Sequence, residues 1–334
     1  MTNGTMRAAR VHQWGTSPTL DEVDVPVAGD GESLVRVEAA AVAHLDRTVV
    51  EGNFDVKPGL PYIGGVEGCG VVVESDSFSP GTRVLLRGGG LGVKRDGTWA
   101  EYVTVATKHL TEVPDGMSPE LGATYFVPVS TAAVALNSVG HLGTWWNEQL
   151  SSPDDEIVIV GGAAGVVGSM IAQIALLQGA RVMGLVKDGS EVARLAKGVE
   201  PIVSDNRKAL RELESNRPAT ILVDTLGGDE LATRTSWVRP GGRAVLIGYV
   251  AGTTASFDLP NWLLQDVPLL PINMMSRNQE AKNIANDYVS SLVSGELFID
   301  IEEFALGDVG HALELLDKGE LRGRAVVDLV RAGS

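Results

Sequence analysis

A glycine-rich turn between an apolar run and a helical pattern is the segment of this chain best suited to hold a phosphate group. The run Glu156–Val160 leads into GGAAGVVG at residues 161–168, and a helical pattern follows over Ser169–Gly179. Gly165 would let backbone N–H groups approach a pyrophosphate, and Gly168 would let the helix pack closely on the strand, where its N-terminus adds partial positive charge. The pattern A-x-G-x-x-G therefore predicts a dinucleotide site, with a purely structural turn as the alternative. The predicted contacts are Ala163, Ala164, Gly165, Val166, Val167 and Gly168.

The end of the next predicted strand, Arg181–Val186, indicates which dinucleotide binds. Sites for NAD usually carry Asp or Glu at this point, where the carboxylate binds the ribose 2′-hydroxyl. Here Val186 is followed by Lys187, and this ammonium favours a 2′-phosphate and therefore NADPH. Asp188 adds a nearby negative charge, and Lys187 could simply be solvated, so NADH remains the alternative.

The elements around this turn predict an α/β protein whose first third is rich in strands. Segments with many valines are separated there by Gly, Pro and Asp turns. They are Leu34–Val42, Gly70–Glu74, Arg83–Leu86 and Ala100–Ala106. From Pro119 onward, helical stretches alternate with apolar runs, which predicts βαβ units and a doubly wound parallel sheet. The runs are Ile157–Val160, Arg181–Val186, Ile221–Val223, Ala244–Ile247 and Pro268–Ile272, and a helix at Asn278–Ser294 and a strand at Arg324–Val330 follow.

Composition excludes several classes of protein. The 334 residues are 44% hydrophobic and 21% charged, which is ordinary for a globular chain and argues against disorder, collagen or a coiled coil. The net charge of −16 argues against a nucleic-acid partner bound through its phosphates. The single cysteine, Cys69, rules out an internal disulfide and a four-cysteine zinc lobe, and it fits a reducing compartment.

One uncharged stretch, Ile157–Ala180, is long enough to cross a bilayer. It is interrupted by the glycine-rich turn and carries Gln173 and Gln178, whose amides are costly in hydrocarbon. A buried strand, a turn and a buried helix explain the same residues better. Met1–Arg10 shows no apolar region of a signal peptide. We therefore expect a cytoplasmic protein with no membrane partner.

Six short motifs occur in the order in which one enzyme family carries them. They are Gly65–Gly70 (GVEGCG), Pro80–Val84 (PGTRV), Gly97–Val103 (GTWAEYV), Val129–Ala133 (VSTAA), Val223–Gly228 (VDTLGG) and Arg239–Arg243 (RPGGR). Each motif alone is weak. Together, and over nearly the whole chain, they resemble the zinc-independent medium-chain dehydrogenases/reductases of the quinone oxidoreductase-like branch.

This resemblance implies a fold, a domain division and an assembly. It implies a GroES-like, β-rich catalytic domain at residues 1–127 and 276–334, and a Rossmann dinucleotide-binding domain at residues 128–275. The active site would lie in the cleft between them. The resemblance also implies a homodimer, commonly built by pairing the last Rossmann strands edge to edge, for which Pro268–Ile272 is the candidate.

The same resemblance predicts that no zinc is bound. Zinc-dependent relatives use a Cys in the first domain, a His directly before the Glu of the Gly-x-Glu motif, and a third ligand near the start of the cofactor domain. The matching positions are Ala43, Val66 and the stretch Val127–Ser130, which offer no zinc ligand. The five histidines are scattered, without ligand spacing. Charge developing on a carbonyl oxygen must then be met by hydrogen-bond donors or a bound water.

Donors of this kind occur near the third predicted strand. Quinone reductases of the family often carry an Asn and a Tyr there, where this chain has Ala43 and Thr48. The candidate donors nearby are His44, Arg47, Thr48 and Tyr62, with a surface histidine and a packed tyrosine as the alternatives. The family position of Thr131 places its hydroxyl near the nicotinamide, the alternative being an ordinary threonine at a helix N-terminus.

Other roles carry over from the family position by position. Asp46 and Glu67 match family acids that we interpret as supports rather than as catalytic acids. Gly248 and Tyr249 follow the strand that should pass the nicotinamide, and Asn273 follows the last Rossmann strand. Arg324 replaces a family lysine that reaches a cofactor phosphate, with a solvated arginine as the alternative.

Three functions remain open from the sequence. The first is an NADPH-dependent, metal-free oxidoreductase that transfers hydride to a small quinone or α,β-unsaturated carbonyl, which is the one we favour. The second is a metal-free ketone or aldehyde reductase. The third is a non-catalytic NADPH-binding protein, which the loss of the family Asn and Tyr supports.

Overall fold

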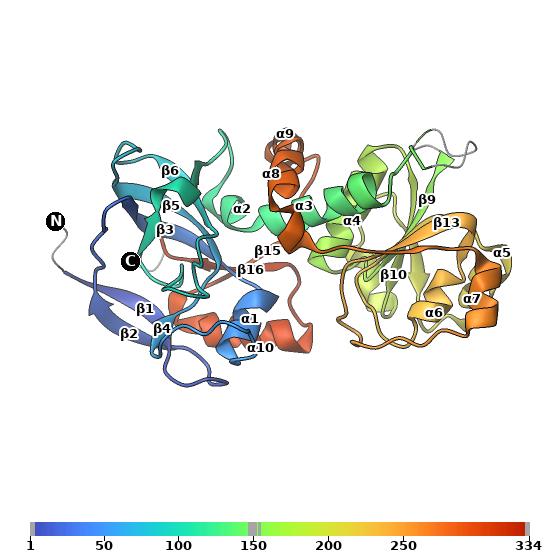
Figure 1. Cartoon of the computed structure of the whole chain (residues 1–334), viewed down its shortest axis with the longest axis horizontal. Coiled ribbons are helices and arrows are strands. Elements are labelled where there is room, and N and C mark those ends of the chain that lie inside the picture. The colour runs from blue at the N-terminus through green and yellow to red at the C-terminus, as the bar shows by residue number, and fades with distance from the viewer. Residues whose placement is uncertain (1–3, 146–151, 153–154, 331–334) are drawn as a thin grey trace. The chain divides into compact units, whose positions relative to one another are not determined.

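The computed structural model describes residues 4–145, 152 and 155–330, and the chain divides into two compact units (Figure 1). Unit 1 is formed by Met1–Tyr125 and Ile299–Ser334, and unit 2 by Phe126–Phe298. The return to the first unit thus comes at residue 299, not at 276 as the sequence analysis expects. The reason is that α8 (Asn278–Asn286) packs on α3 (Phe126–Ala133), inside unit 2.

Polar side chains hold the segment after α8 to unit 2. The hydroxyl of Tyr288 accepts hydrogen bonds from Asn137 Nδ2 at 3.1 Å and Gln178 Nε2 at 2.8 Å. Gln173 binds both backbone groups of Phe298, accepting from its N–H at 2.9 Å and donating to its carbonyl at 3.1 Å. These hydrogen bonds join residues that are far apart in the sequence, so the local sequence pattern does not predict them.

The described part of unit 2 contains a six-stranded parallel sheet in the order β11-β10-β9-β12-β13-β14. Its strands are β9 (Ile157–Gly161), β10 (Arg181–Val186), β11 (Glu200–Val203), β12 (Ala219–Asp224), β13 (Val238–Leu246) and β14 (Leu269–Pro271). The chain runs outward from β9 to β11 and then returns to the other side of β9 as β12. This reversal is a topological switch point, and the expected doubly wound parallel sheet is confirmed.

Helices precede, connect and follow these strands in the described part of unit 2. They are α3 (continued by a π-helical segment at Val134–Val139), α4 (Val166–Leu177), α5 (Arg207–Asn216), α6 (Leu231–Thr235), α7 (Leu259–Gln265), α8 and α9 (Val289–Ser294). The uncharged stretch from Ile157 forms β9, a turn and the largely buried α4, as expected. Among the described residues, no helix is long and apolar enough to span a membrane.

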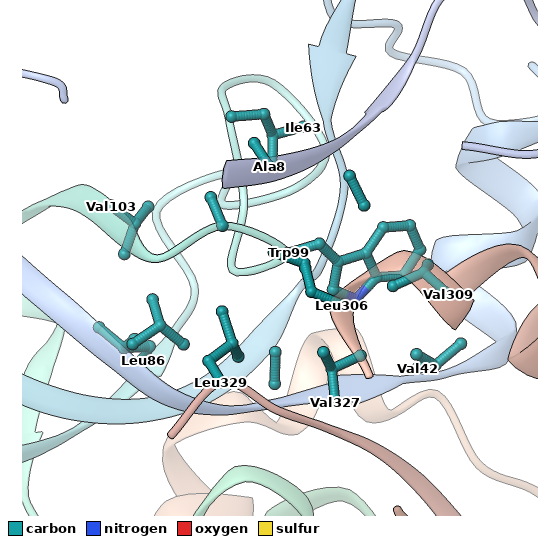
Figure 2. Packing of buried hydrophobic residues seen from close by; sticks show 14 of the residues in the cluster. Ala8, Val42, Ile63, Leu86, Trp99, Val103, Leu306, Val309, Val327 and Leu329 are labelled. Atoms are coloured by element: carbon teal, nitrogen blue, oxygen red, sulfur yellow. The ribbon is translucent and has the colours of Figure 1, made fainter. Parts of the chain in front are cut away.

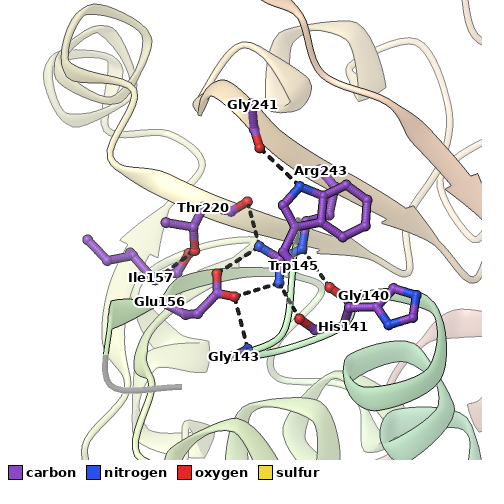
Figure 3. A network of polar contacts seen from close by, with 9 residues as sticks. All are labelled: Gly140, His141, Gly143, Trp145, Glu156, Ile157, Thr220, Gly241 and Arg243. Atoms are coloured by element: carbon purple, nitrogen blue, oxygen red, sulfur yellow. Dashed lines mark hydrogen bonds and ion pairs between the residues drawn. The ribbon is translucent and has the colours of Figure 1, made fainter. Parts of the chain in front are cut away.

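A buried ion pair closes the base of the sheet in unit 2 (Figure 3). The side chains of Arg243 and Glu156 are both 0% exposed, with Nη2 and Oε1 2.7 Å apart. Arg243 Nε also donates to the carbonyl of Gly140 at 2.6 Å, and the guanidinium lies 5.1 Å from the ring centroid of Trp145. The last arginine of the Arg-Pro-Gly-Gly-Arg motif therefore ties β13 to the start of β9 and to the loop after the π-helical segment.

Within its described residues, unit 1 contains a three-stranded sheet, β2-β1-β4, and a larger sheet in the order β15-β16-β3-β5-β6-β8, with β7 also paired to β3. The strands are β1 (Thr5–Val11), β2 (Thr19–Asp24), β3 (Glu32–Val42), β4 (Tyr62–Ile63), β5 (Glu67–Glu74), β6 (Arg83–Arg87), β7 (Tyr102–Ala106), β8 (Leu110–Glu112), β15 (Ile301–Phe304) and β16 (Arg324–Asp328). The helices are α1 (His44–Val50), α2 (Pro119–Thr124) and α10 (Val309–Lys318).

The core of unit 1 is built around Trp99, whose side chain is fully buried (Figure 2). Its indole Nε1 donates to the carbonyl of Ala41 at 2.9 Å, so the ring brings no unpaired polar group into the core. A Cβ on Gly64 would lie 2.5 Å from this ring, which explains the glycine there. Val327 from the far end of the chain packs in the same cluster, so this core needs both chain segments.

Candidate cofactor and catalytic sites

The glycine-rich turn of unit 2 has the geometry of a backbone anion site. Gly162 has a φ of +75°, and a Cβ on Gly168 would overlap its carbonyl group, so α4 can approach β9 only with glycine at position 168. Gly165 is the N-cap of α4 and is exposed. The N–H groups of the first helical turn have no partner inside a helix, and their dipoles favour an anion.

The switch point lies beside this turn. Thr225, after β12, donates through Oγ1 to the carbonyl of Gly161 at 2.7 Å. Asp224 is 0% exposed and is held by Arg234 at 2.5 Å and by the N–H of Gly227 at 2.7 Å. The carboxylate of Asp224 at the end of β12 is therefore neutralised by Arg234. Its negative charge does not oppose the binding of an anion at the neighbouring turn.

The predicted residues after β13 reach the same edge of the sheet. A Cβ on Gly248 would lie 2.5 Å from the carbonyl oxygen of Thr225, and Ala251 N donates to the carbonyl of Leu226 at 2.8 Å. Tyr249 is 71% exposed beside them. The loops after β9, β12 and β13 thus meet at the carboxyl edge of the sheet, which is where open α/β sheets bind ligands.

The end of β10 presents Lys187 to solvent. Its backbone N–H donates to Glu191 Oε2 at 2.8 Å, while its side chain is exposed. The neighbouring carboxylate of Asp188 accepts hydrogen bonds from the hydroxyl of Ser190 at 2.5 Å and its N–H at 2.8 Å, and these bonds lower the pKa of Asp188. Asp188 is turned toward Ser190, and the Lys187 ammonium makes no described ion pair.

The remaining cofactor candidates lie in different places. Asn273 follows β14 at the carboxyl edge, but its side chain caps the next turn by accepting from Met275 N at 3.0 Å. Thr131 lies on α3 and is 5% exposed. Arg324 lies in unit 1, where its Nη2 is 2.7 Å from Glu67 Oε2, and its side chain is only 12% exposed. Arg324 is therefore neither solvated nor free in this structure.

Helix α1 in unit 1 carries three of the predicted donors, His44, Arg47 and Thr48. Thr48 donates through Oγ1 to the carbonyl of His44 at 2.9 Å, so this hydroxyl is satisfied within the helix. Burial of the ring and the nearby charge of Arg324 lower the pKa of His44, and Asp317 partly offsets them. The lowered pKa favours the neutral form of the His44 ring. Arg47 is bound by Asp317 at 2.5 Å and by Glu51 at 2.7 Å.

Tyr62 is part of the core of unit 1. It is 2% exposed, its ring centroid lies 5.6 Å from that of Trp14, and its hydroxyl has no hydrogen-bond partner among the described residues. Burial raises the pKa of Tyr62, and the charge of Asp46 raises it further. The hydroxyl thus stays protonated as a donor, beside a buried carboxylate.

Two buried carboxylates adjoin these residues. Asp46 is 2% exposed and accepts from Ala43 N at 2.8 Å and Val66 N at 2.9 Å. Burial raises the pKa of Glu67, which the charges of Arg324 and Arg87 oppose. Sequence analysis identifies the motifs of Glu67 and Arg324 separately but misses their ion pair, since no local signal joins positions so far apart.

Unit 2 thus carries a parallel sheet with a glycine-rich turn at its carboxyl edge, and unit 1 is rich in strands and contains buried acids. The alcohol dehydrogenase GroES-like domain model matches residues 29–115, and the zinc-binding dehydrogenase model matches residues 166–290. An alcohol dehydrogenase of Moraxella sp. is 26% identical over 97% of this chain and 99% of its own length. A quinone oxidoreductase of Pongo abelii is 25% identical over 73% of each chain.

Solved structures share the fold. The structure of AibC superposes with a TM-score of 0.80 at 20% identity, covering 98% of this chain and 96% of its own. The Pseudomonas syringae quinone oxidoreductase gives a TM-score of 0.77 at 24% identity over 97% and 99% of the two chains. The chain belongs to the medium-chain dehydrogenases/reductases and is quinone oxidoreductase-like, with a GroES-like domain and a Rossmann-type sheet. It is an oxidoreductase of a family that uses a nicotinamide cofactor.

The residues present do not fit the zinc ion that the second family model names. Ala43 and Val66 are 7% and 9% exposed and offer only hydrocarbon side chains. Asp46 is occupied by two backbone N–H groups, and Glu67 by Arg324. In the described ranges, no group of three or more His, Cys, Asp or Glu side chains could hold a metal ion.

Proposed function

We propose that this chain is an NADPH-dependent oxidoreductase that works without a metal and transfers hydride to a small quinone or α,β-unsaturated carbonyl. The observation that carries this proposal is the hydrocarbon character of Ala43 and Val66, with Asp46 binding their backbones. Without a Lewis acid, negative charge on a carbonyl oxygen must be met by hydrogen bonds. Quinones and enones suit this condition because their charge is delocalised over a conjugated system.

The cofactor would be held at the carboxyl edge of the sheet in unit 2. The first turn of α4 would bind its phosphates, the loop at Gly248 and Tyr249 would border its nicotinamide, and Lys187 would bind a 2′-phosphate. The exposed ammonium of Lys187 and the capture of Asp188 by Ser190 support NADPH over NADH, which stays the alternative. The bound cofactor supplies the hydride, and the protein supplies orientation and electrostatics.

The acceptor would be oriented by hydrogen-bond donors. His44, Thr48, Tyr62 and Thr131 remain our candidates. Part of His44 is accessible to solvent, while the protein packed around its ring lowers the pKa and favours the neutral form, which could donate a hydrogen bond to the acceptor. Tyr62 is deeply buried and Thr48 already bonds to the helix, so both would need a local change to reach a substrate.

We further propose a homodimer formed by the edge strand β14. It is the last strand of its sheet in the described chain, and an unpaired edge offers N–H and C=O groups to a second copy. Leu263 and Leu264 on the preceding helix α7 are 75% and 80% exposed, which supports a covered face. The single Cys69 supports a cytoplasmic location. Light scattering behind size exclusion, with Leu264→Glu as the variant, tests the dimer.

The decisive experiment follows oxidation of NADPH and NADH at 340 nm with benzoquinone, naphthoquinone, an enone, a saturated ketone and an aldehyde, each with and without a chelator. Turnover of quinone or enone with NADPH, unchanged by chelator, is the expected result. Loss of turnover with chelator contradicts metal-free catalysis. Turnover of the saturated carbonyl alone supports a ketone or aldehyde reductase, and tight NADPH binding without turnover supports a non-catalytic protein.

A further inference from the structure

Asp46 is a buried carboxylate that joins two segments of unit 1. Its Oδ2 accepts the N–H of Ala43, the N-cap of α1, at 2.8 Å. Its Oδ1 accepts the N–H of Val66, in the turn before β5, at 2.9 Å. One side chain, 2% exposed, therefore holds the start of α1 against this turn, and both oxygens are used for that purpose.

The turn at Gly64–Glu67 is fixed independently from its other side. Thr98 N donates to the carbonyl of Gly65 at 3.0 Å and Trp99 N to that of Gly64 at 3.0 Å. Thr98 Oγ1 also donates to the carbonyl of Glu67 at 2.9 Å. Because Trp99 is anchored in the core (Figure 2), the turn is a rigid frame, and Asp46 sets the position of α1 on it.

Candidate functional side chains lie on both segments that Asp46 joins. His44 and Thr48 lie on α1, and the turn leads into Glu67, which is paired with Arg324. A shift of the first turn of α1 would move His44 relative to that ion pair. Misplacement by about 1 Å of a group that orients a substrate costs roughly 100-fold in rate.

We propose, on the basis of the function proposed above, that Asp46 is a positioning residue: its ionised carboxylate sets His44 and α1 relative to the turn before β5, without touching the substrate. The carboxylate form is the one that does this best, because hydrogen bonds to an ionised acceptor are about twice as strong as neutral ones. A side chain that keeps the size but not the charge would hold only one of the two N–H groups.

The surroundings make this link sensitive to pH. Burial raises the pKa of Asp46 to about 7, its bonds with Ala43 and Val66 oppose the rise, Glu67 adds to it, and Arg324 opposes it. The other titratable groups nearby are Tyr62 on β4, Arg87 on β6, and His44 with Asp317 on α1 and α10. Protonation as the pH falls through about 7 removes the charge and weakens the grip on both N–H groups.

The first test compares the full-length wild type with Asp46→Asn, using the acceptor that the wild type reduces and following kcat against pH. We expect kcat to fall roughly 10- to 100-fold in the variant, with the Kd for NADPH unchanged, since a misplaced group costs rate rather than cofactor affinity. We also expect the decline of wild-type kcat below pH 7 to be absent. Glu38→Gln is the matched control, because Glu38 is 7% exposed in the same unit and binds Arg36 and Arg83.

A second test needs neither turnover nor a variant that folds. In ¹H–¹⁵N spectra of the wild type, the amides of Ala43 and Val66 should titrate together with a midpoint near pH 7. A constant Val66 amide shift from pH 5.5 to 8.5 would overturn the proposal, as would Asp46→Asn with kcat within twofold of wild type and the same pH profile. A wild type without turnover contradicts the proposed function instead, so the two failures are distinguishable.

Discussion

The candidate sites of the two units are formed by different kinds of chemical group. In unit 2, the site consists of backbone N–H groups, glycines and loop ends at the carboxyl edge of a parallel sheet. In unit 1, the candidate site consists of buried, charged side chains. Asp46 accepts hydrogen bonds from two backbone N–H groups, and Glu67 forms an ion pair with Arg324. A backbone site depends on the close approach of main-chain groups, whereas a cluster of buried charges depends on every partner being present.

This difference explains why the two sites respond differently to the same kind of substitution. Removing a side chain from the glycine-rich turn changes little, since that turn offers its backbone, and adding one is harmful. In the cluster of unit 1 the reverse holds, because removing one partner leaves the other buried and unpaired. The predictions below test this contrast.

The largest effect should come from Arg324→Leu in unit 1. The side chains of Arg324 and Glu67 are 12% and 7% exposed, so the change leaves a buried carboxylate without its hydrogen-bonded partner. A broken buried pair costs about 3–5 kcal/mol of unfolding free energy. Urea unfolding followed by circular dichroism measures this loss, and Glu67→Gln in the same chain should restore part of it.

The control for that variant is Arg36→Leu. Arg36 also binds a buried acid, Glu38, but is itself 42% exposed, and Glu38 keeps Arg83 as a second partner. Its loss should cost about 1 kcal/mol or less. Equal losses of unfolding free energy in the two variants would show that the Glu67–Arg324 pair stabilises unit 1 no more than an exposed pair does. That result would remove the contrast between the units.

A smaller effect is expected from Gly168→Ala in unit 2. The new Cβ would overlap the carbonyl of Gly162 and push α4 away from β9. Overpacking of this kind costs about 1–3 kcal/mol, and we expect NADPH affinity to fall roughly 30-fold with a modest loss of stability. Quenching of tryptophan fluorescence by NADPH measures the Kd. Gly189→Ala is the control, since a Cβ there meets no atom within 4 Å, and a similar Kd for both variants would contradict the steric argument.

The smallest effect is expected from Lys187→Ala. If the ammonium meets a 2′-phosphate, its removal should weaken NADPH by about 1–2 kcal/mol, or roughly 10-fold, and leave NADH unchanged. Lys208→Ala on α5 is a matched control, because Lys208 is an exposed lysine of the same unit whose side chain is 88% exposed. An unchanged ratio of the two Kd values would remove Lys187 from the site and favour NADH.

Much of the parallel sheet in unit 2 could be predicted because central strands such as β9 and β12 are buried on both faces and therefore form continuous apolar runs in the sequence. The strand Arg181–Val186 is found with the bounds predicted, and β9 and β14 lie within one residue at either end. The strand β11, Glu200–Val203, escapes prediction because it is a short edge strand with exposed residues. The helix expected at Asn278–Ser294 is divided into α8 and α9.

The candidate sites were predictable to the extent that they are local. The glycine-rich turn is contiguous, and steric reasons for Gly165 and Gly168 can be argued from the sequence alone. Asp46 and Glu67 were interpreted as supports, which agrees with their burial, but their partners Val66 and Arg324 could not be derived. Contacts between residues distant along the chain depend on tertiary packing. The packed tyrosine considered for Tyr62 agrees with its burial in the core.

The core around Trp99, which contains residues from both chain segments of unit 1, has a consequence for the order of folding. Unit 2 is one continuous segment, so it can form while synthesis is still under way. In unit 1, β3 pairs with β16, joining Val42 to Ala325, and this contact spans most of the chain. Pairing over this separation forms slowly, because the entropy of closing the loop must be overcome before the contact forms, so we expect it late in folding. Until β16 is in place, the backbone groups of β3 at Ala39–Val42 lack the strand that pairs with them in the folded unit.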